Sequence, residues 1–182
     1  PRVLEQLSGK TRVIRKYGVG LDRIDVAAAA RLGIKVFNTP GSNHVAVAEH
    51  TFALALALIR KVPSLNETVH RGEWRRSTGS ELAGKSIGVF GFGRVGKEVA
   101  KRAMCFGMNV VVFNTSWGAP QDYSLNELRF VFAHPLFSEY APSIQRVSNC
   151  DEALAQSDII ALHMSLNEAS RGFLNRKRLS AC

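Results

Sequence analysis

A glycine-rich turn between an apolar strand and an amphipathic helix constrains the fold of this chain more than any other feature. The turn is Gly91-Phe92-Gly93-Arg94-Val95-Gly96. The apolar run at 85–90 before it predicts a buried parallel strand. The stretch 95–106 after it places apolar side chains on one helical stripe and ends at Gly107, and 108–113 predicts a second strand. The sequence therefore predicts a β-α-β unit with a G-x-G-x-x-G turn after its first strand.

The spacing of the three glycines suits a bound dinucleotide. Gly91 permits a tight turn, Gly93 lets the backbone approach an anionic pyrophosphate, and Gly96 lets the helix pack closely on the strand. The helix N-terminus adds unpaired N–H groups and a partial positive charge. A glycine-rich turn without a ligand is the alternative, but the β-α-β frame favours the dinucleotide site.

Asn114 ends the second predicted strand, where this fingerprint normally carries an acidic residue. An asparagine can hydrogen-bond a ribose hydroxyl, but it does not repel a 2′-phosphate. Thr115 and Ser116 follow as candidate phosphate donors, yet no Arg or Lys follows directly. The choice between NAD and NADP stays open, with a slight preference for tolerance of NADP. An ordinary turn beginning at Asn114 is the other interpretation.

The composition excludes several other classes of protein. The 182 residues are 46% hydrophobic, which is typical of a globular chain, and carry a net charge of +9. The basic residues are scattered, so we expect an anionic cofactor and substrate and no nucleic-acid partner. Three cysteines without a C-x-x-C pair suit a reducing, cytoplasmic location. The histidines show no metal-ligand spacing, so no metal is expected, and the apolar run 52–59 is too short to span a membrane.

The rest of the chain predicts a second α/β unit and a helical connection. A strand at 12–14, a helix at 26–32 capped by Asp25 and a strand at 34–37 come first. A long apolar helix then runs to about Lys61, Pro63 ends or kinks it, and a shorter helix follows. This order predicts two α/β lobes with a cleft between them. The segment 117–143, with three prolines, is left unassigned before a helix at 151–156 and a strand at 159–163. Because the chain starts without Met and stops inside a helix capped by Asn175, we interpret it as a fragment.

Six segments together resemble the D-isomer-specific 2-hydroxyacid dehydrogenases, the family of phosphoglycerate dehydrogenase and glyoxylate/hydroxypyruvate reductase. Residues 17–25 resemble the family's G-x-G-x-D-x-I-D loop, and 38–43 with 47–49 resemble its N-T-P…V-A-E segment. The others are the segments 71–74 and 82–85, the fingerprint itself, and 157–163, which is similar to S-D-I-V-x-L-H.

The resemblance implies an α/β fold: an incomplete, Rossmann-type doubly wound parallel sheet plus part of a flavodoxin-like lobe. Residues 1–42 would be the C-terminal part of the substrate-binding lobe. Residues 43–182 would be the NAD(P)-binding Rossmann domain, lacking its last strands. The resemblance also implies a homodimer with the long helix at the interface; packing of that helix on its own sheet is the alternative.

The resemblance also assigns site residues. Val19 and Gly20 match the loop whose backbone N–H groups hold the substrate carboxylate, although a plain turn is the alternative. Arg94 and Val95 match positions that touch the pyrophosphate through the backbone.

Three further positions match the family's cofactor site or depart from it. Val47 matches a residue that packs near the nicotinamide, and Met164 matches a position along the cofactor. Asn114 stands where the family usually has Asp, and Ser165 where it usually has Pro.

The family's acid/base His, its supporting Glu and its substrate-binding Arg belong to segments beyond Cys182, so no catalytic residue is assigned here. The parent protein would transfer a hydride between NAD or NADP and a 2-hydroxy or 2-oxo acid, and this chain alone would be inactive. A non-catalytic dinucleotide sensor, similar to the family's corepressors, and an inactive relic are the alternatives.

Overall fold

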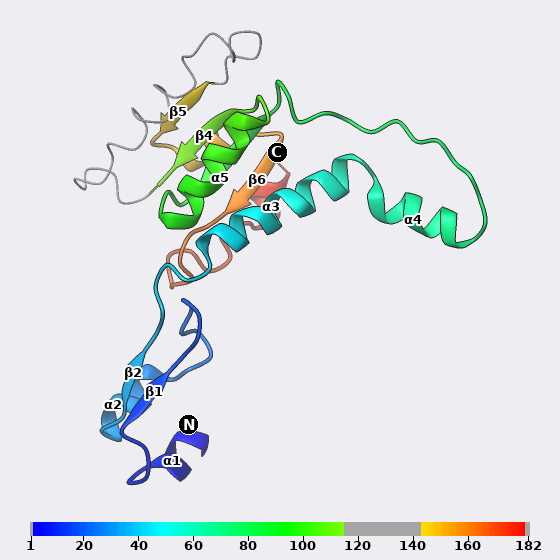
Figure 1. Cartoon of the computed structure of the whole chain (residues 1–182). Helices are drawn as coiled ribbons and strands as arrows, with labels where there is room; N and C mark the ends of the chain where they lie inside the picture. Colours follow the sequence, from blue (N-terminus) through cyan, green and yellow to red (C-terminus); the bar gives the residue numbers. More distant parts are fainter. Residues whose placement is uncertain (1, 115–142, 181–182) are drawn as a thin grey trace.

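Two parallel sheets organise the chain (Figure 1). The structure, a computed structural model, describes residues 2–114 and 143–180. One sheet pairs β1 (Val13–Arg15) with β2 (Lys35–Phe37). The other has the order β5-β4-β3-β6, with strands β3 (Ser86–Phe90), β4 (Asn109–Phe113), β5 (Ile144–Val147) and β6 (Ile159–Leu162). All pairs are parallel, which confirms the predicted α/β class and its Rossmann-type sheet.

The two-stranded sheet belongs to a small unit with its own core. Helices α1 (Arg2–Leu7) and α2 (Val26–Arg31) pack with it around Leu4, Ala29 and Ile34. Asp25 caps α2 as predicted, because its Oδ1 accepts a hydrogen bond of 2.8 Å from the Ala28 N–H. Figure 1 shows this unit, in blue, at one end of the molecule.

Helix α3 (His44–Ile59) joins this unit to the larger sheet and packs on α5 (Arg94–Cys105) through the buried Ala48 and Phe52. The predicted break before Pro63 occurs at Lys61, whose φ of 56° is left-handed, and α4 (Val62–His70) then runs away from the sheet (Figure 1). Among the residues that the structure describes, no helix is both long and apolar enough to cross a membrane.

Helices cover both faces of the four-stranded sheet, because its side chains alternate between two cores. Ile87, Val89, Val110 and Val112 pack on the side of α5 and α3. Phe90 and Val111 pack on the other side with α7 (Cys150–Ala155) and with the segment before α8 (Arg176–Leu179).

Two elements, α1 and β5, were not predicted from the sequence. In β5 only the two end residues are buried and the polar pair between them is exposed, so the strand has neither an apolar run nor an alternating pattern. It pairs with β4, and the backbone N–H and the hydroxyl of Ser143 just before it hydrogen-bond Asn109 Oδ1. The unassigned segment 117–143 lies outside the described residues except for Ser143.

Candidate functional site

The glycine-rich turn lies at the point where the order of the strands reverses. The chain passes from β3 to β4 and β5 on one side and returns to pair β6 with the other side of β3. In open α/β sheets, ligands bind at the carboxyl ends of the strands at such a point. Gly91 follows β3 with a φ of 97°, and a Cβ there would come within 2.8 Å of the backbone of His163 and Met164. Only glycine fits between the two strand ends.

Gly93 opens the turn toward solvent. It is the N-cap of α5 and makes no side-chain cap bond, so the N-cap residue leaves the first N–H groups of the helix uncapped. A Cβ on Gly93 would meet nothing within 4 Å, in contrast to one on Gly91 or Gly96. Open space in front of uncapped N–H groups at a helix N-terminus is an arrangement that binds anions such as phosphate.

A cavity of about 470 Å³ lies over this turn. Its walls come from the carboxyl ends of β3, β4 and β6, from the start of α7 and from the segment leading to α8. The lining residues are Gly91, Phe92, Gly93, Phe113, Asn114, Cys150, His163, Met164, Ser165, Asn167, Ala169, Ser170, Phe173 and Arg178. The volume is within the range of cofactor pockets, and the walls combine three phenylalanines with polar residues.

His163 brings a buried polar atom to the cavity wall. Its backbone N–H donates to Phe90 O at 2.8 Å, whereas its Nε2 is buried and has no hydrogen-bond partner among the described residues. Burial lowers the pKa of the imidazole below its ordinary value, so the neutral form is favoured. A buried nitrogen without a partner is rare in a native protein and is compatible with a bound group that supplies the partner.

The predicted cofactor residues fall into three groups. Gly91, Gly93, Asn114 and Met164 line the cavity together, and Ser165, where the resemblance expects Pro, lines it as well. Arg94, Val95 and Gly96 form the first turn of α5 beside the cavity. Val47 lies on α3 and is partly exposed, and it does not line this cavity.

The predicted substrate residues lie in the loop after β1. The Asn38 side chain donates to Val19 O at 2.8 Å, and the Gly18 N–H donates to Thr39 Oγ1 at 2.8 Å, so the loop after β2 holds the loop after β1. Within the part of the chain that the structure describes, the N–H groups of Val19 and Gly20 donate no hydrogen bond. Their role toward a carboxylate stays a prediction.

Sequence reasoning missed several cavity residues, among them Cys150, Phe173 and Arg178. Each follows the fingerprint by many residues and matches no motif. One signal near them was Asn175, which caps α8 by accepting from the Arg178 N–H and so sets where Arg178 lies along the helix. The candidate donors Thr115 and Ser116 lie outside the described residues.

The residues present fit a dinucleotide. Gly93 and the start of α5 suit the pyrophosphate, Asn114 suits a ribose hydroxyl, and the aromatic walls suit a flat ring. The fold and the site together define an α/β domain of the dinucleotide-binding class.

Comparison with known proteins gives the family. Residues 52–182 match the family described as "D-isomer specific 2-hydroxyacid dehydrogenase, NAD binding domain". The chain is 36% identical to D-3-phosphoglycerate dehydrogenase of Bacillus subtilis, over 98% of this chain and 32% of that protein. It is 34% identical to hydroxypyruvate reductase of Thermotoga maritima, over 93% of this chain and 49% of that protein.

The fold is also similar to that of a solved enzyme complex. D-lactate dehydrogenase from Aquifex aeolicus, complexed with NAD and lactic acid, superposes with a TM-score of 0.73 at 27% identity, over 97% of this chain and 49% of that chain. This chain therefore belongs to the D-isomer specific 2-hydroxyacid dehydrogenase family, whose NAD(P)-binding domain it contains. It spans about a third to a half of the length of these relatives.

Proposed function

We propose that this chain forms the NAD(P)-binding part of an oxidoreductase that transfers a hydride between a nicotinamide cofactor and a 2-hydroxy or 2-oxo acid. The observation that carries the proposal is the cavity over the Gly91 turn, because the open Gly93 and the polar Asn114 lie in one concave site. The bound nicotinamide would supply the hydride donor or acceptor. The protein residues would bind and orient the cofactor and the substrate.

Each predicted residue has a proposed task. Arg94 and Val95 would hold the pyrophosphate through their backbone N–H groups at the start of α5. Met164 would lie along the cofactor and Val47 near the nicotinamide. Val19 and Gly20 would bind the substrate carboxylate through their N–H groups, which is supported by the way the β2 loop holds the β1 loop.

We propose that residues 1–42 act as part of the substrate lobe and 43–182 as the cofactor lobe. Two observations support this division. The two sheets share no strand, and the core around Leu4 and Ile34 is separate from the two cores of the larger sheet. A dimer through α3 is proposed as well, because Leu54 and Leu58 on this helix are 59% and 77% exposed.

The isolated chain would bind cofactor without turning over substrate. An acid/base histidine in such a reaction needs a carboxylate partner to stabilise its charged form. Within residues 2–114 and 143–180, no histidine forms an ion pair with an Asp or Glu. Steady-state oxidation of NADH by this chain with glyoxylate or hydroxypyruvate would contradict this part of the proposal.

A titration with NADH tests the binding site. Gly93→Val adds a side chain into the open space of the turn without meeting any protein atom near the Cβ, so the fold should persist while dinucleotide binding weakens by about tenfold or more. Cys105→Ala, at the exposed far end of α5, is the control and should bind as the wild type does. Equal affinity of Gly93→Val and the wild type would refute the site.

A further inference from the structure

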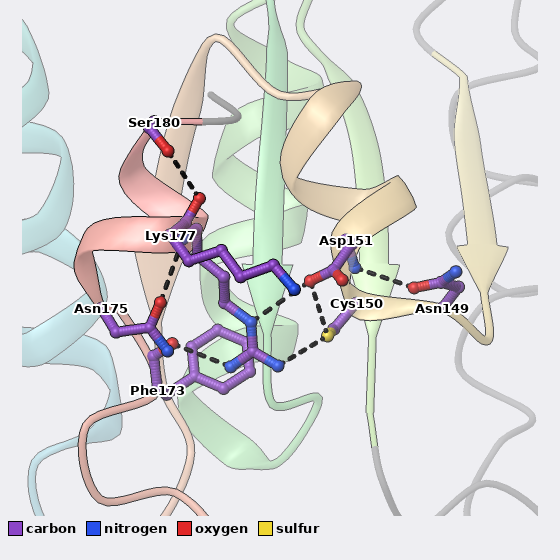
Figure 2. Close-up of polar contacts among 8 residues, drawn as sticks. Asn149, Cys150, Asp151, Phe173, Asn175, Lys177 and Ser180 are labelled. Atoms are coloured by element: carbon purple, nitrogen blue, oxygen red, sulfur yellow. Dashed lines mark hydrogen bonds and ion pairs between the residues drawn. The ribbon is translucent and has the colours of Figure 1, made fainter.

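Four residues form a cluster around a guanidinium at one end of the cavity: Cys150, Asp151, Phe173 and Arg178, here called the Arg178 cluster. Arg178 donates from Nη1 to Phe173 O at 2.8 Å, from Nη2 to Cys150 Sγ at 3.2 Å and from Nε to Asp151 Oδ1 at 3.2 Å. Its Cζ lies 4.4 Å from the centroid of the Phe173 ring. Figure 2 shows Cys150, Asp151 and Phe173 converging on this point from α7 and from the segment before α8.

The position of the cluster identifies the part of a dinucleotide that would reach it. The sheet order places β4 between β3 and β5, and Cys150 starts α7 soon after β5. A dinucleotide with its pyrophosphate at Gly93 and its ribose at Asn114 continues in the same direction, so its base comes to lie toward β5. Cys150, Phe173 and Arg178 line the same cavity as Gly93 and Asn114.

The hydrogen bonds of Arg178 determine what the side chain can offer. Phosphate recognition by arginine uses the N–H fork, and in this protein three of the five N–H groups of Arg178, one on each nitrogen, donate to protein acceptors. Asp151 also balances much of the charge, and Arg178 contributes to lowering the pKa of that carboxyl, after the Cys150 hydrogen bond. A guanidinium held in this way presents a planar cation on which an aromatic base can stack.

The Phe173 ring fixes the plane of that cation. Phe173 packs on the fully buried Phe90 with ring centroids 5.4 Å apart, and Phe90 packs in turn on Phe113, which also lines the cavity. The ring on which Arg178 rests is therefore anchored to β3 and β4 of the sheet. A rigid platform reduces the entropy lost when a ligand stacks on it.

We propose that Arg178 is an adenine-binding residue, whose guanidinium, held flat by Phe173, Cys150 and Asp151, stacks on the adenine base of the dinucleotide. The proposal rests on the proposed function of the cavity and adds a residue that binds the base. It also predicts that Arg178 serves NAD and NADP alike, because the 2′-phosphate lies at the ribose and not at the base.

Binding of cofactor fragments to the 182-residue chain tests the proposal. Calorimetric titrations would use ADP, NADH, NADPH and reduced nicotinamide mononucleotide, which has no adenine. Arg178→Gln should weaken the binding of ADP, NADH and NADPH by about fivefold or more and leave the affinity for the mononucleotide unchanged. Arg176→Gln is the matched control, since Arg176 is an exposed arginine of the same short helix. It should bind all four ligands as the wild type does.

A second variant keeps the test valid if Arg178→Gln does not fold. Arg178→Lys retains the positive charge beside Asp151 but loses the plane, so its ADP affinity should also fall. ADP affinity equal to wild type in either folded variant would overturn the proposal. So would a loss confined to NADPH, which would assign Arg178 to the 2′-phosphate. A wild-type chain that binds none of the four ligands would contradict the proposed function itself, whereas wild-type binding with an unaffected variant contradicts only the role of Arg178.

Discussion

Gly96 lies directly against the carbonyl oxygen of Gly91, so that a Cβ on Gly96 would overlap this oxygen and come within 3.1 Å of a Val89 methyl group. Both neighbours belong to the buried end of β3 and its turn, and neither is the far end of a flexible side chain. We expect Gly96→Ala to lower the free energy of unfolding by about 1–3 kcal/mol through overpacking. Urea unfolding followed by circular dichroism measures this.

Gly93→Ala is the control for this measurement. Gly93 lies in the same turn, but its φ is negative and its Cβ position is empty, so the free energy of unfolding should change by less than about 0.5 kcal/mol. Equal destabilisation by the two substitutions would contradict the view that Gly96 is required for packing and Gly93 only for access of a ligand.

Asn114 should set the preference between NAD and NADP. It ends β4 on the cavity wall and carries no charge to repel a 2′-phosphate. Asn114→Asp places a carboxylate there. This change should weaken the binding of NADPH by about tenfold and leave the binding of NADH unchanged or tighter. The ratio of the two dissociation constants is the measurement, with Asn167→Asp, elsewhere on the same wall, as the control. An unchanged ratio in Asn114→Asp would remove this residue from the ribose site.

The sheet and its turn could be predicted from local sequence because each element carries its own signal. The apolar strand of β3, the stripe of α5 and the caps at Asp25 and Asn175 all depend on residues close in the chain. Strand β5 could not be predicted in this way, because its pairing with β4 determines its structure more than its own side chains do.

The candidate site also contains residues that a local motif predicts and residues that only tertiary contacts bring together. The positions of Gly91 and Gly93 follow from a motif, whereas Arg178 reaches the cavity only because α8 folds back beside α7. Contacts between segments distant in sequence leave no period or spacing to detect. A prediction from sequence therefore located the end of the cavity formed by the glycine-rich turn and missed the end formed by the Arg178 cluster.

His163 should make stability depend on pH near neutrality. Burial lowers the pKa of the folded imidazole below its ordinary 6.5, so the unfolded chain binds the proton more tightly. The free energy of unfolding should therefore fall as the pH drops through 6.5, until the folded group is protonated as well. His163→Gln should flatten this part of the profile between about pH 7.5 and about pH 5, and His70→Gln on α4 is the control substitution. Parallel profiles of the wild type and His163→Gln would contradict the assignment.

Glu98 should stabilise the fold near neutral pH and lose this stabilising effect in acid. Its carboxylate accepts from Lys101 at 2.9 Å and Arg102 at 2.6 Å, and these hydrogen bonds, Lys101 first, lower its pKa from 4.5. Arg102 Nη2 also lies 3.7 Å from Glu49 Oε1 of α3, so the ion pair between Arg102 and Glu49 helps to hold α5 on α3. We expect Glu98→Gln to cost less than about 1 kcal/mol at pH 7.

A lowered carboxyl pKa stabilises the fold above 4.5, and the contribution disappears as the pH falls through the folded pKa. The difference in the free energy of unfolding between the wild type and Glu98→Gln should therefore shrink toward zero below pH 4.5. Glu81→Gln, which removes an exposed carboxylate outside these ion pairs, is the control. A difference that stays constant down to pH 3 would mean that Glu98 stabilises by packing and not by charge.

The exposed face of α3 should hold two copies of the chain together. Leu54 and Leu58 are one turn apart and largely exposed, while Ala48 and Phe52 of the same helix are buried against α5. The double substitution Leu54→Glu and Leu58→Glu should convert a dimer to a monomer, because four carboxylates would meet across a two-fold interface. Sedimentation velocity measures the change, and Val3→Glu, an exposed apolar residue of α1, is the control. If the wild type sediments as a monomer, or the variant as a dimer, α3 is not the interface.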